Sequence, residues 1–353
     1  MSTELQQQVS RIRADQIQSA PIHAGVASLF LDPKEAAGID VKVVLDAALD
    51  GIQEIEQYDN RISKYRGSLF QDSSIYVQRE LKTSKENESI NKEISSLLEL
   101  LSLYASLPPT HRILEYLIRR YKVQELNATE LIKCSISQHD SKIFARVVQL
   151  STISGTVWSF LEQVKVSGSP IPRSLLSKQC SKNNAFLTMI SQVVQSAVSL
   201  TGGVESYQKI TLEGAERLIS FYTVLVVEMI RSKPLQDVQL RTLYPSLISG
   251  LKAGKHGVIE VSWRRANSIV LIEISKKVQL NQDLILVLSN LIAKSFVFYA
   301  KSEEMSSADC IEFVTLLVLL AQHQRVRFTA ATINIILSCR NGDEGINSEI
   351  THF

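Results

Sequence analysis

Glycine, proline and cysteine are scarce in this sequence. Its 353 residues include 14 glycines and 8 prolines, too few for the many tight turns of an all-β sandwich or barrel. The four cysteines are far apart, with no CxxC pair and no histidine at metal-ligand spacing: Cys134, Cys180, Cys310 and Cys339. This pattern predicts buried thiols in a reducing compartment and argues against a disulfide framework or a zinc site.

Long apolar runs are missing too. Residues 1–17 are polar and of mixed charge, which does not fit a signal peptide. The longest apolar stretch, Phe313–Ala321, is about half of the ~20 residues that a bilayer-spanning helix needs. We therefore expect no association with a membrane.

The chain also lacks a strong excess of one charge. Lysine and arginine total 38 against 36 acidic residues, which gives a formal net charge of +2. A dedicated nucleic-acid-binding domain usually has a much larger basic excess. Hydrophobic residues make up 45% of the chain, so the sequence has enough apolar surface for a folded body.

Motifs of catalysis and ligand binding are absent from the sequence. Gly250–His256 has three residues between its glycines where a Walker A loop has four, and a histidine follows its lysine, so we predict a turn between helices with a glycine C-cap. The six histidines are dispersed and show no HExxH spacing. We expect no enzymatic activity, no metal, no cofactor and no small-molecule substrate.

Helical periodicity runs through nearly the whole chain. Between Asp40, an apt N-cap, and Asp59, the apolar positions fall on one helical face: Val41, Val44, Leu45, Ala48, Leu49, Ile52 and Ile55. Residues 63–85 are polar and predict short elements and loop. Further helices are predicted up to about residue 105 and near 128–137, 141–150, 154–166 and 172–181.

Local signals mark where several of these helices begin. Thr83 and Glu86 have the spacing of a capping box, and so do Asn127 and Glu130. The pair Pro108-Pro109 predicts the end of one helix and the start of the next, because proline is favoured only in the first turn.

Beyond residue 183 the predicted helices form regular pairs. The pairs are 183–200 with 211–231, 236–252 with 259–278, and 281–300 with 304–322, followed by a single helix near 328–340. Their spacing matches the ~40–47 residues of HEAT and armadillo repeats. We predict an all-α, HEAT/armadillo-like α-solenoid of stacked antiparallel helix pairs. The expected organisation is an irregular helical region over 1–182, regular pairs over 183–340, and a frayed polar tail over 341–353.

One stretch is distinctive in its residues rather than its period. It is the run from Leu114 to Asn127, LEYLIRRYKVQELN, and five other segments accompany it: Ser28–Ala37, Ser68–Phe70, Glu86–Glu88, Phe144–Leu150 and Gly168–Arg173. In this order they resemble the amino-terminal region of the U-three snoRNA-associated protein ten family, called HEAT-repeat-containing protein one in animals. Tyr116, where the family often has tryptophan, and Gln138-His139 depart mildly from its pattern.

The resemblance implies the amino-terminal part of a much longer, non-catalytic HEAT-repeat protein of the nucleolus. It implies a scaffold in ribosome biogenesis, within the small-subunit processome (the 90S pre-ribosome). The implied partners are other subunits of the transcription-associated subcomplex that engages the 5′ external transcribed spacer for pre-18S rRNA processing and is linked to rDNA transcription. Pre-rRNA and the U3 snoRNP are further implied partners in the assembled particle.

Clusters of basic residues are the candidate binding surface. They are Arg119, Arg120, Lys122, Arg264, Arg265, Lys276 and Lys277. Such cations can contact phosphates, or they can pair with acids of the adjacent repeat, and the near-neutral net charge favours pairing. Two alternatives to a protein-docking scaffold remain open at this point: direct binding of pre-rRNA through these clusters, and a generic HEAT adaptor in transport or trafficking.

Overall fold

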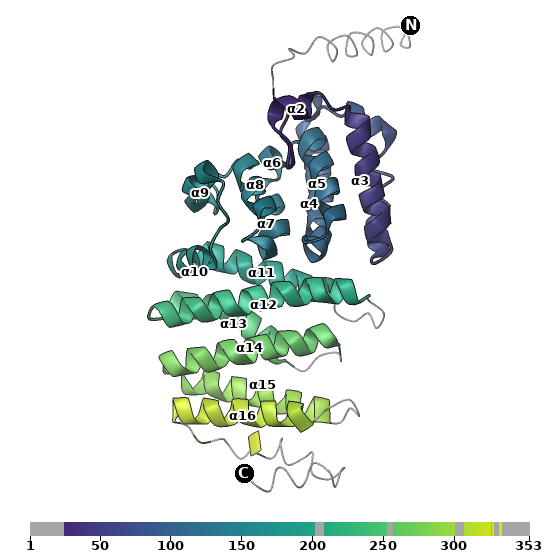
Figure 1. Cartoon of the computed structure of the whole chain (residues 1–353). Coiled ribbons are helices and arrows are strands. Elements are labelled where there is room, and N and C mark those ends of the chain that lie inside the picture. The colour runs from purple at the N-terminus through teal and green to yellow at the C-terminus, as the bar shows by residue number, and fades with distance from the viewer. Residues whose placement is uncertain are drawn as a thin grey trace.

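The computed structural model describes residues 25–201, 208–252, 257–300, 307–325, 327, 332 and 333. Within these ranges every regular element is an α-helix or a 3-10 helix, and the chain is an all-α solenoid (Figure 1). The first α-helices are α2 (Pro33–Ala37), α3 (Val41–Glu56), α4 (Ser84–Leu101), α5 (Pro108–Tyr121), α6 (Val123–Leu126), α7 (Ala128–Ser135), α8 (Lys142–Leu150), α9 (Glu162–Ser167) and α10 (Arg173–Lys182). Six longer helices follow: α11 (Asn184–Thr201), α12 (Lys209–Ser232), α13 (Asp237–Leu251), α14 (Val258–Lys277), α15 (Gln282–Ala300) and α16 (Ser307–Gln324).

The first long helix, α3, forms as its sequence predicts. Asp40 caps it by accepting a hydrogen bond from the backbone N–H of Lys42, and the predicted apolar face is buried against α5. The two helices approach closely at Gly51, where a Cβ would meet the backbone carbonyl of Pro109 at 2.7 Å. A glycine is needed here because any side chain would push α5 away.

Most of the predicted helix starts in the first part of the chain are confirmed. Thr83 and Glu86 form a reciprocal capping box on α4, and Pro108 and Pro109 open α5. The region 63–85 contains the short 3-10 helices η1 (Asn60–Tyr65), η2 (Asp72–Tyr76) and η3 (Arg79–Leu81). The helix predicted over 154–166 begins later, because only η6 (Ser159–Leu161) and α9 are helical there.

The capping box predicted at Asn127 and Glu130 is wrong. The Asn127 side chain makes no cap hydrogen bond to α7 and instead accepts one from Arg79 at 3.2 Å. Arg79 is buried and also donates to the side chains of Asn87 and Asn91. A buried guanidinium without a carboxylate partner needs several neutral acceptors, and this demand outweighs the local preference for a cap.

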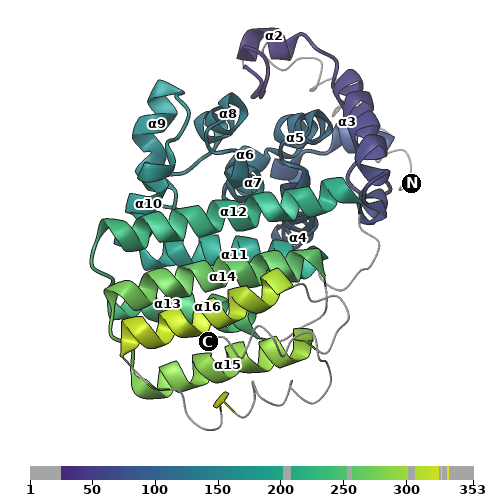
Figure 2. The ribbon, with the colours of Figure 1, turned by 60° about the horizontal axis from the view of Figure 1, so that its bottom comes forward.

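From α11 onward the helices form the three predicted antiparallel pairs, stacked in two layers. We call α12, α14 and α16 layer A, and α11, α13 and α15 layer B (Figure 2). Each helix packs against its pair partner and against the next helix of its own layer. The helix predicted near 328–340 and the tail over 341–353 lie outside the described residues, apart from 332 and 333. Gly250 lies inside α13 against Asn267, so it is not a C-cap, and residues 253–256 are not described.

One buried core runs through both parts of the chain. The described apolar residues from Leu29 to Leu320 form a single contiguous cluster. The first part meets layer A where α12 crosses η4 (Ser102–Tyr104), and Gly214 faces the carbonyl oxygen of Leu103 there. The division at residues 182 and 183 stays a prediction.

The close approach at Gly214 gives a test of how the two parts are joined. A Cβ at this position would fall inside van der Waals distance of the Leu103 backbone, which has no flexible side-chain end to move aside. We expect Gly214→Ala to lower the free energy of unfolding by about 2–3 kcal/mol, although alanine favours a helix by about 1 kcal/mol elsewhere.

Urea unfolding followed by circular dichroism measures this change. Gly67→Ala is the matched control, because a Cβ there meets nothing within 4 Å. Equal stability of the two variants would show that α12 and η4 are not in close contact.

Candidate interaction surfaces

The first cluster of candidate cations holds the amino-terminal segment in place. Arg119 is 4% exposed and pairs with Glu115, whose carboxylate also accepts from the Ser28 hydroxyl and the Leu29 backbone N–H, both at 2.7 Å. Arg146 donates to the backbone carbonyl of Ser28 at 3.0 Å. One buried cluster of hydrogen bonds therefore joins three segments that are distinctive in sequence: 28–37, 114–127 and 144–150.

Its neighbours Arg120 and Lys122 also have partners within the chain. The Arg120 guanidinium donates to the backbone carbonyl of Val77, and its burial lowers the pKa of the group. Lys122, in the left-handed conformation at φ 49°, pairs with Glu80 and is partly exposed. Of these three cations, Lys122 is the one that reaches solvent.

The second cluster joins successive repeats of layer A. Arg264 is 4% exposed, bridges to Glu312 at 3.2 Å, and stacks over the ring of Phe313 at 4.2 Å. Arg265 is half exposed and pairs with Asp309 at 2.9 Å and Glu312 at 3.0 Å. The pairing of basic residues with acids of the adjacent repeat is thus present here.

The third cluster lies at the end of α14. Glu273, nearly buried, accepts from Arg231 at 2.8 Å and from Lys276 at 3.0 Å. Hydrogen bonds from Arg231, supported by those from Lys276, lower the pKa of Glu273 to about 2. Lys277 beside them is exposed. The structure therefore places the seven candidate cations at three separate sites, and a binding role for them stays a prediction.

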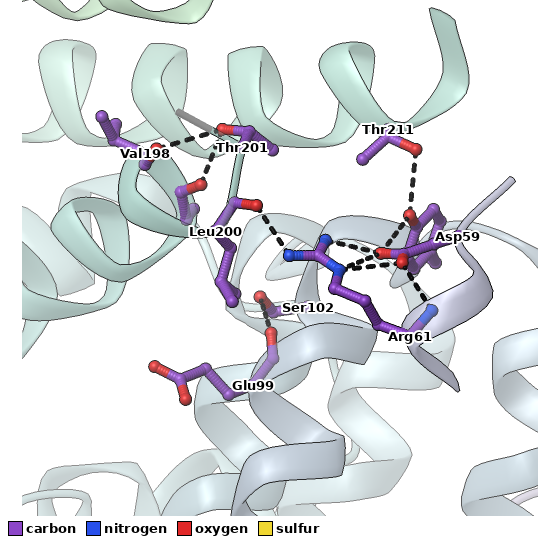
Figure 3. Close-up of polar contacts among 10 residues, drawn as sticks. Asp59, Arg61, Glu99, Ser102, Val198, Leu200, Thr201 and Thr211 are labelled. Carbon is purple, nitrogen blue, oxygen red and sulfur yellow. Dashed lines mark hydrogen bonds and ion pairs between the residues drawn. The ribbon is translucent and has the colours of Figure 1, made fainter. Parts of the chain in front are cut away.

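A buried polar network joins the first part of the chain to α11 and α12 (Figure 3). Asp59 forms an ion pair with Arg61 at 2.6 Å and accepts a hydrogen bond from the Tyr104 hydroxyl at 3.0 Å. Arg61 donates to the carbonyl of Leu200 at the end of α11, and Tyr104 contacts the Thr211 hydroxyl at the start of α12. Burial alone would raise the pKa of Asp59, but the hydrogen bonds and charge of Arg61 outweigh it and lower the pKa.

A cavity of about 340 Å³ opens between α4, α7 and α11. Its apolar lining comes from Leu98, Met189 and Val193, and its rim carries the carboxylates of Glu99 and Glu130. The Ser196 hydroxyl donates to Glu99, and Cys134 lies at the wall, where burial raises the pKa of the thiol to about 12. A thiol with so high a pKa stays protonated at neutral pH, and the protonated form is a poor nucleophile.

The helices of layer B have fewer charged residues than the first two helices of layer A. The helix α11 has no charged residue, α13, α15 and the layer A helix α16 have two each, and α12 and α14 have six each. Layer B exposes large apolar side chains at Val238, Ile248, Leu286, Val287 and Phe298, and layer A exposes as many. We call the exposed side of α11, α13 and α15 the neutral face.

The neutral face was not found from the sequence, although a signal for it was present. No Asp or Glu occurs between residues 163 and 204, and no charge of either sign occurs within 184–201. A single helix without charge is ordinary in a core, so the pattern alone does not say which side of α11 reaches solvent. Once exposed, a surface poor in charge and partly apolar is typical of the centre of a protein–protein interface.

The described residues contain no cluster of three or more His, Cys, Asp or Glu side chains that could hold a metal ion. One described helix, α15, has a stretch long and apolar enough to cross a membrane, Gln282–Tyr299, and 44% of that stretch is buried within the protein. The helix packs against α13 and α16.

Stacked antiparallel helix pairs in two layers define an α-solenoid of the HEAT-repeat class. No family model matches the sequence. The chain is 31% identical over 255 residues to the HEAT repeat-containing protein 1 homolog of Drosophila melanogaster, covering 71% of the chain and 12% of that protein. It is 28% identical over 300 residues to HEAT repeat-containing protein 1 of Homo sapiens, covering 83% of the chain and 13% of that protein.

A fungal relative has a different name. U3 small nucleolar RNA-associated protein 10 of Yarrowia lipolytica is 26% identical over 269 residues, which covers 76% of the chain and 16% of that protein. The chain belongs to the family that contains HEAT repeat-containing protein 1 and U3 small nucleolar RNA-associated protein 10. It spans between 12% and 16% of the length of these relatives.

The Asp59 network predicts a measurable loss of stability when its charge is removed. Asp59→Asn leaves the half-buried Arg61 without its anion, and we expect the free energy of unfolding to fall by about 1–3 kcal/mol at pH 7. Glu56→Gln is the matched control: it breaks the more exposed pair with Arg66 and should cost less than about 0.5 kcal/mol. Urea unfolding of the two variants measures both losses of stability. Equal losses would contradict a stabilising role of the Asp59 network.

The Glu273 pair predicts a pH dependence of defined sign. Because the folded pKa of Glu273 is about 2 and the unfolded value is about 4.3, its contribution is present above about pH 5 and is lost as the pH falls toward 2. We expect Glu273→Gln to lower stability by about 1–2 kcal/mol at pH 7, after discounting for the exposure of Arg231, and the difference from the unmodified chain to shrink below pH 5.

Thermal unfolding between pH 7 and pH 3 measures this difference. The control Glu228→Gln removes the exposed pair with Arg173 and should cost less than about 0.5 kcal/mol. A Glu273→Gln deficit that stays constant down to pH 3 would contradict the assignment.

Proposed function

We propose that this chain is a non-catalytic scaffold in ribosome biogenesis that docks protein subunits of the small-subunit processome through its neutral face. Its relatives are named for HEAT repeats and for association with U3 small nucleolar RNA, which supports a role in the U3-associated processome. Within this proposal the chain acts in the nucleolus, in the subcomplex that engages the 5′ external transcribed spacer for pre-18S rRNA processing and that is linked to rDNA transcription.

The observation that carries the proposal is the low charge of α11, α13 and α15 compared with α12 and α14. Interfaces between proteins are depleted of charge at their centres and enriched in apolar side chains. The neutral face is low in charge over three adjacent helices, and two of them, α13 and α15, expose large apolar side chains. In contrast, Arg119, Arg264 and Glu273 already have partners within the chain, which supports a structural use of those charges.

The test introduces charge into the neutral face. The double variant Ile248→Asp with Val287→Asp places two carboxylates where a partner would have to desolvate them. We expect tagged chain 1–353 to recover processome proteins from nucleolar extract in an RNase-resistant manner, and the double variant to recover at least tenfold less. Mass spectrometry of the recovered proteins measures both.

The matched control is Val224→Asp with Ile269→Asp, two similarly exposed apolar positions on layer A. It should recover processome proteins as the unmodified chain does. Recovery that is abolished by RNase treatment would shift the function to RNA binding. Recovery of transport proteins without processome proteins would instead favour a generic HEAT adaptor.

A further inference from the structure

The helices of layer A all end at one edge of the solenoid. Because α12, α14 and α16 each follow an antiparallel partner, they run in the same direction, and their carboxyl ends line up on the left in Figure 1. The short helix α10 lies at the same edge: Arg173 pairs with Glu228 near the end of α12, and the Gln239 side chain donates to the carbonyl of Ser181 at 2.9 Å.

Polar contacts continue along this edge from one helix end to the next. Arg231 at the end of α12 pairs with Glu273 near the end of α14. The buried side chain of Gln324, the last residue of α16, donates to the carbonyls of Ser275 at 2.7 Å and Val278 at 2.9 Å. The ends of α10, α12, α14 and α16 therefore form one continuous row.

This row carries exposed cations that have no partner among the described residues. They are Lys178, Lys182, Lys233, Lys277, Arg325 and Arg327, and we call them the basic edge. Of the acids at this edge, Glu228 and Glu273 pair with Arg173 and Arg231. Asp237 and Asp283, in the first turns of α13 and α15, are exposed at the same edge, and the six cations outnumber them.

The helix dipole accounts for only part of these cations. A positive side chain in the last turn of a helix is favoured by the dipole, which explains about one cation at each end. Lys178 lies inside α10 rather than at its end, and Lys182 follows it one turn later. Both belong to the stretch 163–204 that contains no acid, so the surplus is local and is not balanced nearby along the chain.

We propose that the basic edge binds the phosphodiester backbone of a single-stranded nucleic acid without reading its bases. Lysines dominate the row, and they act as flexible point charges that suit phosphates spaced along a strand. Segments 172–182, 231–237 and 276–283 contain no aromatic residue, so these parts of the edge offer neither base stacking nor the aromatic anchors typical of protein interfaces. The identity of the strand as RNA in the cell rests on the proposed function. The binding of a single strand to the basic edge does not depend on that function.

The test reverses four charges of the basic edge: Lys178→Glu, Lys182→Glu, Lys233→Glu and Lys277→Glu. The matched control reverses four exposed lysines on other surfaces, Lys34, Lys42, Lys85 and Lys294, and so changes the net charge by the same amount. Binding of the 353-residue chain to a labelled single-stranded RNA of about 20 mixed nucleotides is followed by fluorescence anisotropy between about 50 and 200 mM KCl.

We expect the edge variant to bind at least tenfold more weakly at about 50 mM salt. The slope of log K against log salt should shrink by about 3, because each phosphate that a lysine neutralises contributes ~0.7 to the slope for a single strand. The control should bind less than about threefold more weakly, and a DNA strand of the same sequence should bind as the RNA does. Thermal unfolding midpoints of both variants, compared with that of the unmodified chain, show whether they fold.

Three results would overturn the proposal. They are an unmodified chain that does not bind the strand, equal weakening in the edge variant and its control, and a polyglutamate peptide that binds the edge more tightly than RNA does. The last result would assign the edge to an acidic protein segment. The edge variant should still recover RNase-resistant processome proteins, so the failure of this proposal and the failure of the scaffold are distinguishable.

Discussion

The helices of layer A have apolar surfaces too wide for one neighbour to cover. In α12 the buried residues run from Thr211 to Ile230 and include Phe221 and Ile230, which lie on opposite sides of the helix because they are nine residues apart. Such a helix is stable only with a pair partner and with further helices on both flanks. The two layers follow from this constraint, and so does the common direction of α12, α14 and α16. The stacking leaves four surfaces exposed to other molecules: an outer face of each layer and two edges.

Ion pairs connect the successive helices α10, α12, α14 and α16. Arg173 pairs with Glu228, Arg231 with Glu273, and Arg264 with Glu312, so each step contains at least one pair. At the junction with the first part of the chain, the Arg61 cation lies at the carboxyl end of α11, where it donates to the carbonyl of Leu200. The Asp59 anion lies near the amino end of α12, to which it is connected through the Tyr104 and Thr211 hydroxyls. Both placements agree in sign with the helix dipoles.

Much of the fold could be predicted from the sequence, because its determinants are local. Asp40, Thr83 and Pro108 mark helix starts through hydrogen bonds and torsions within a few residues, and the paired periods beyond 183 give the solenoid. Asn127 failed as a cap because Arg79, 48 residues away, competes for its side chain. The basic clusters were located in the sequence, but the burial of Arg119 and Arg264 depends on Ala36 and Glu312, whose proximity only the tertiary fold provides. The neutral face was missed for a similar reason: exposure is a property of packing, not of one helix.

In the two proposals, a protein and a nucleic-acid strand bind at different places on the solenoid. A docked protein must desolvate the surface it covers, which is costly for charged groups and favourable for apolar ones. Binding of phosphates is instead favoured by exposed cations that stay hydrated and mobile. One surface cannot serve both well, and in this chain the two properties lie on different parts of the solenoid. The neutral face follows the exposed side of layer B, and the basic edge follows the carboxyl ends of layer A, so that a protein and a nucleic-acid strand could occupy the chain together without competing for the same side chains.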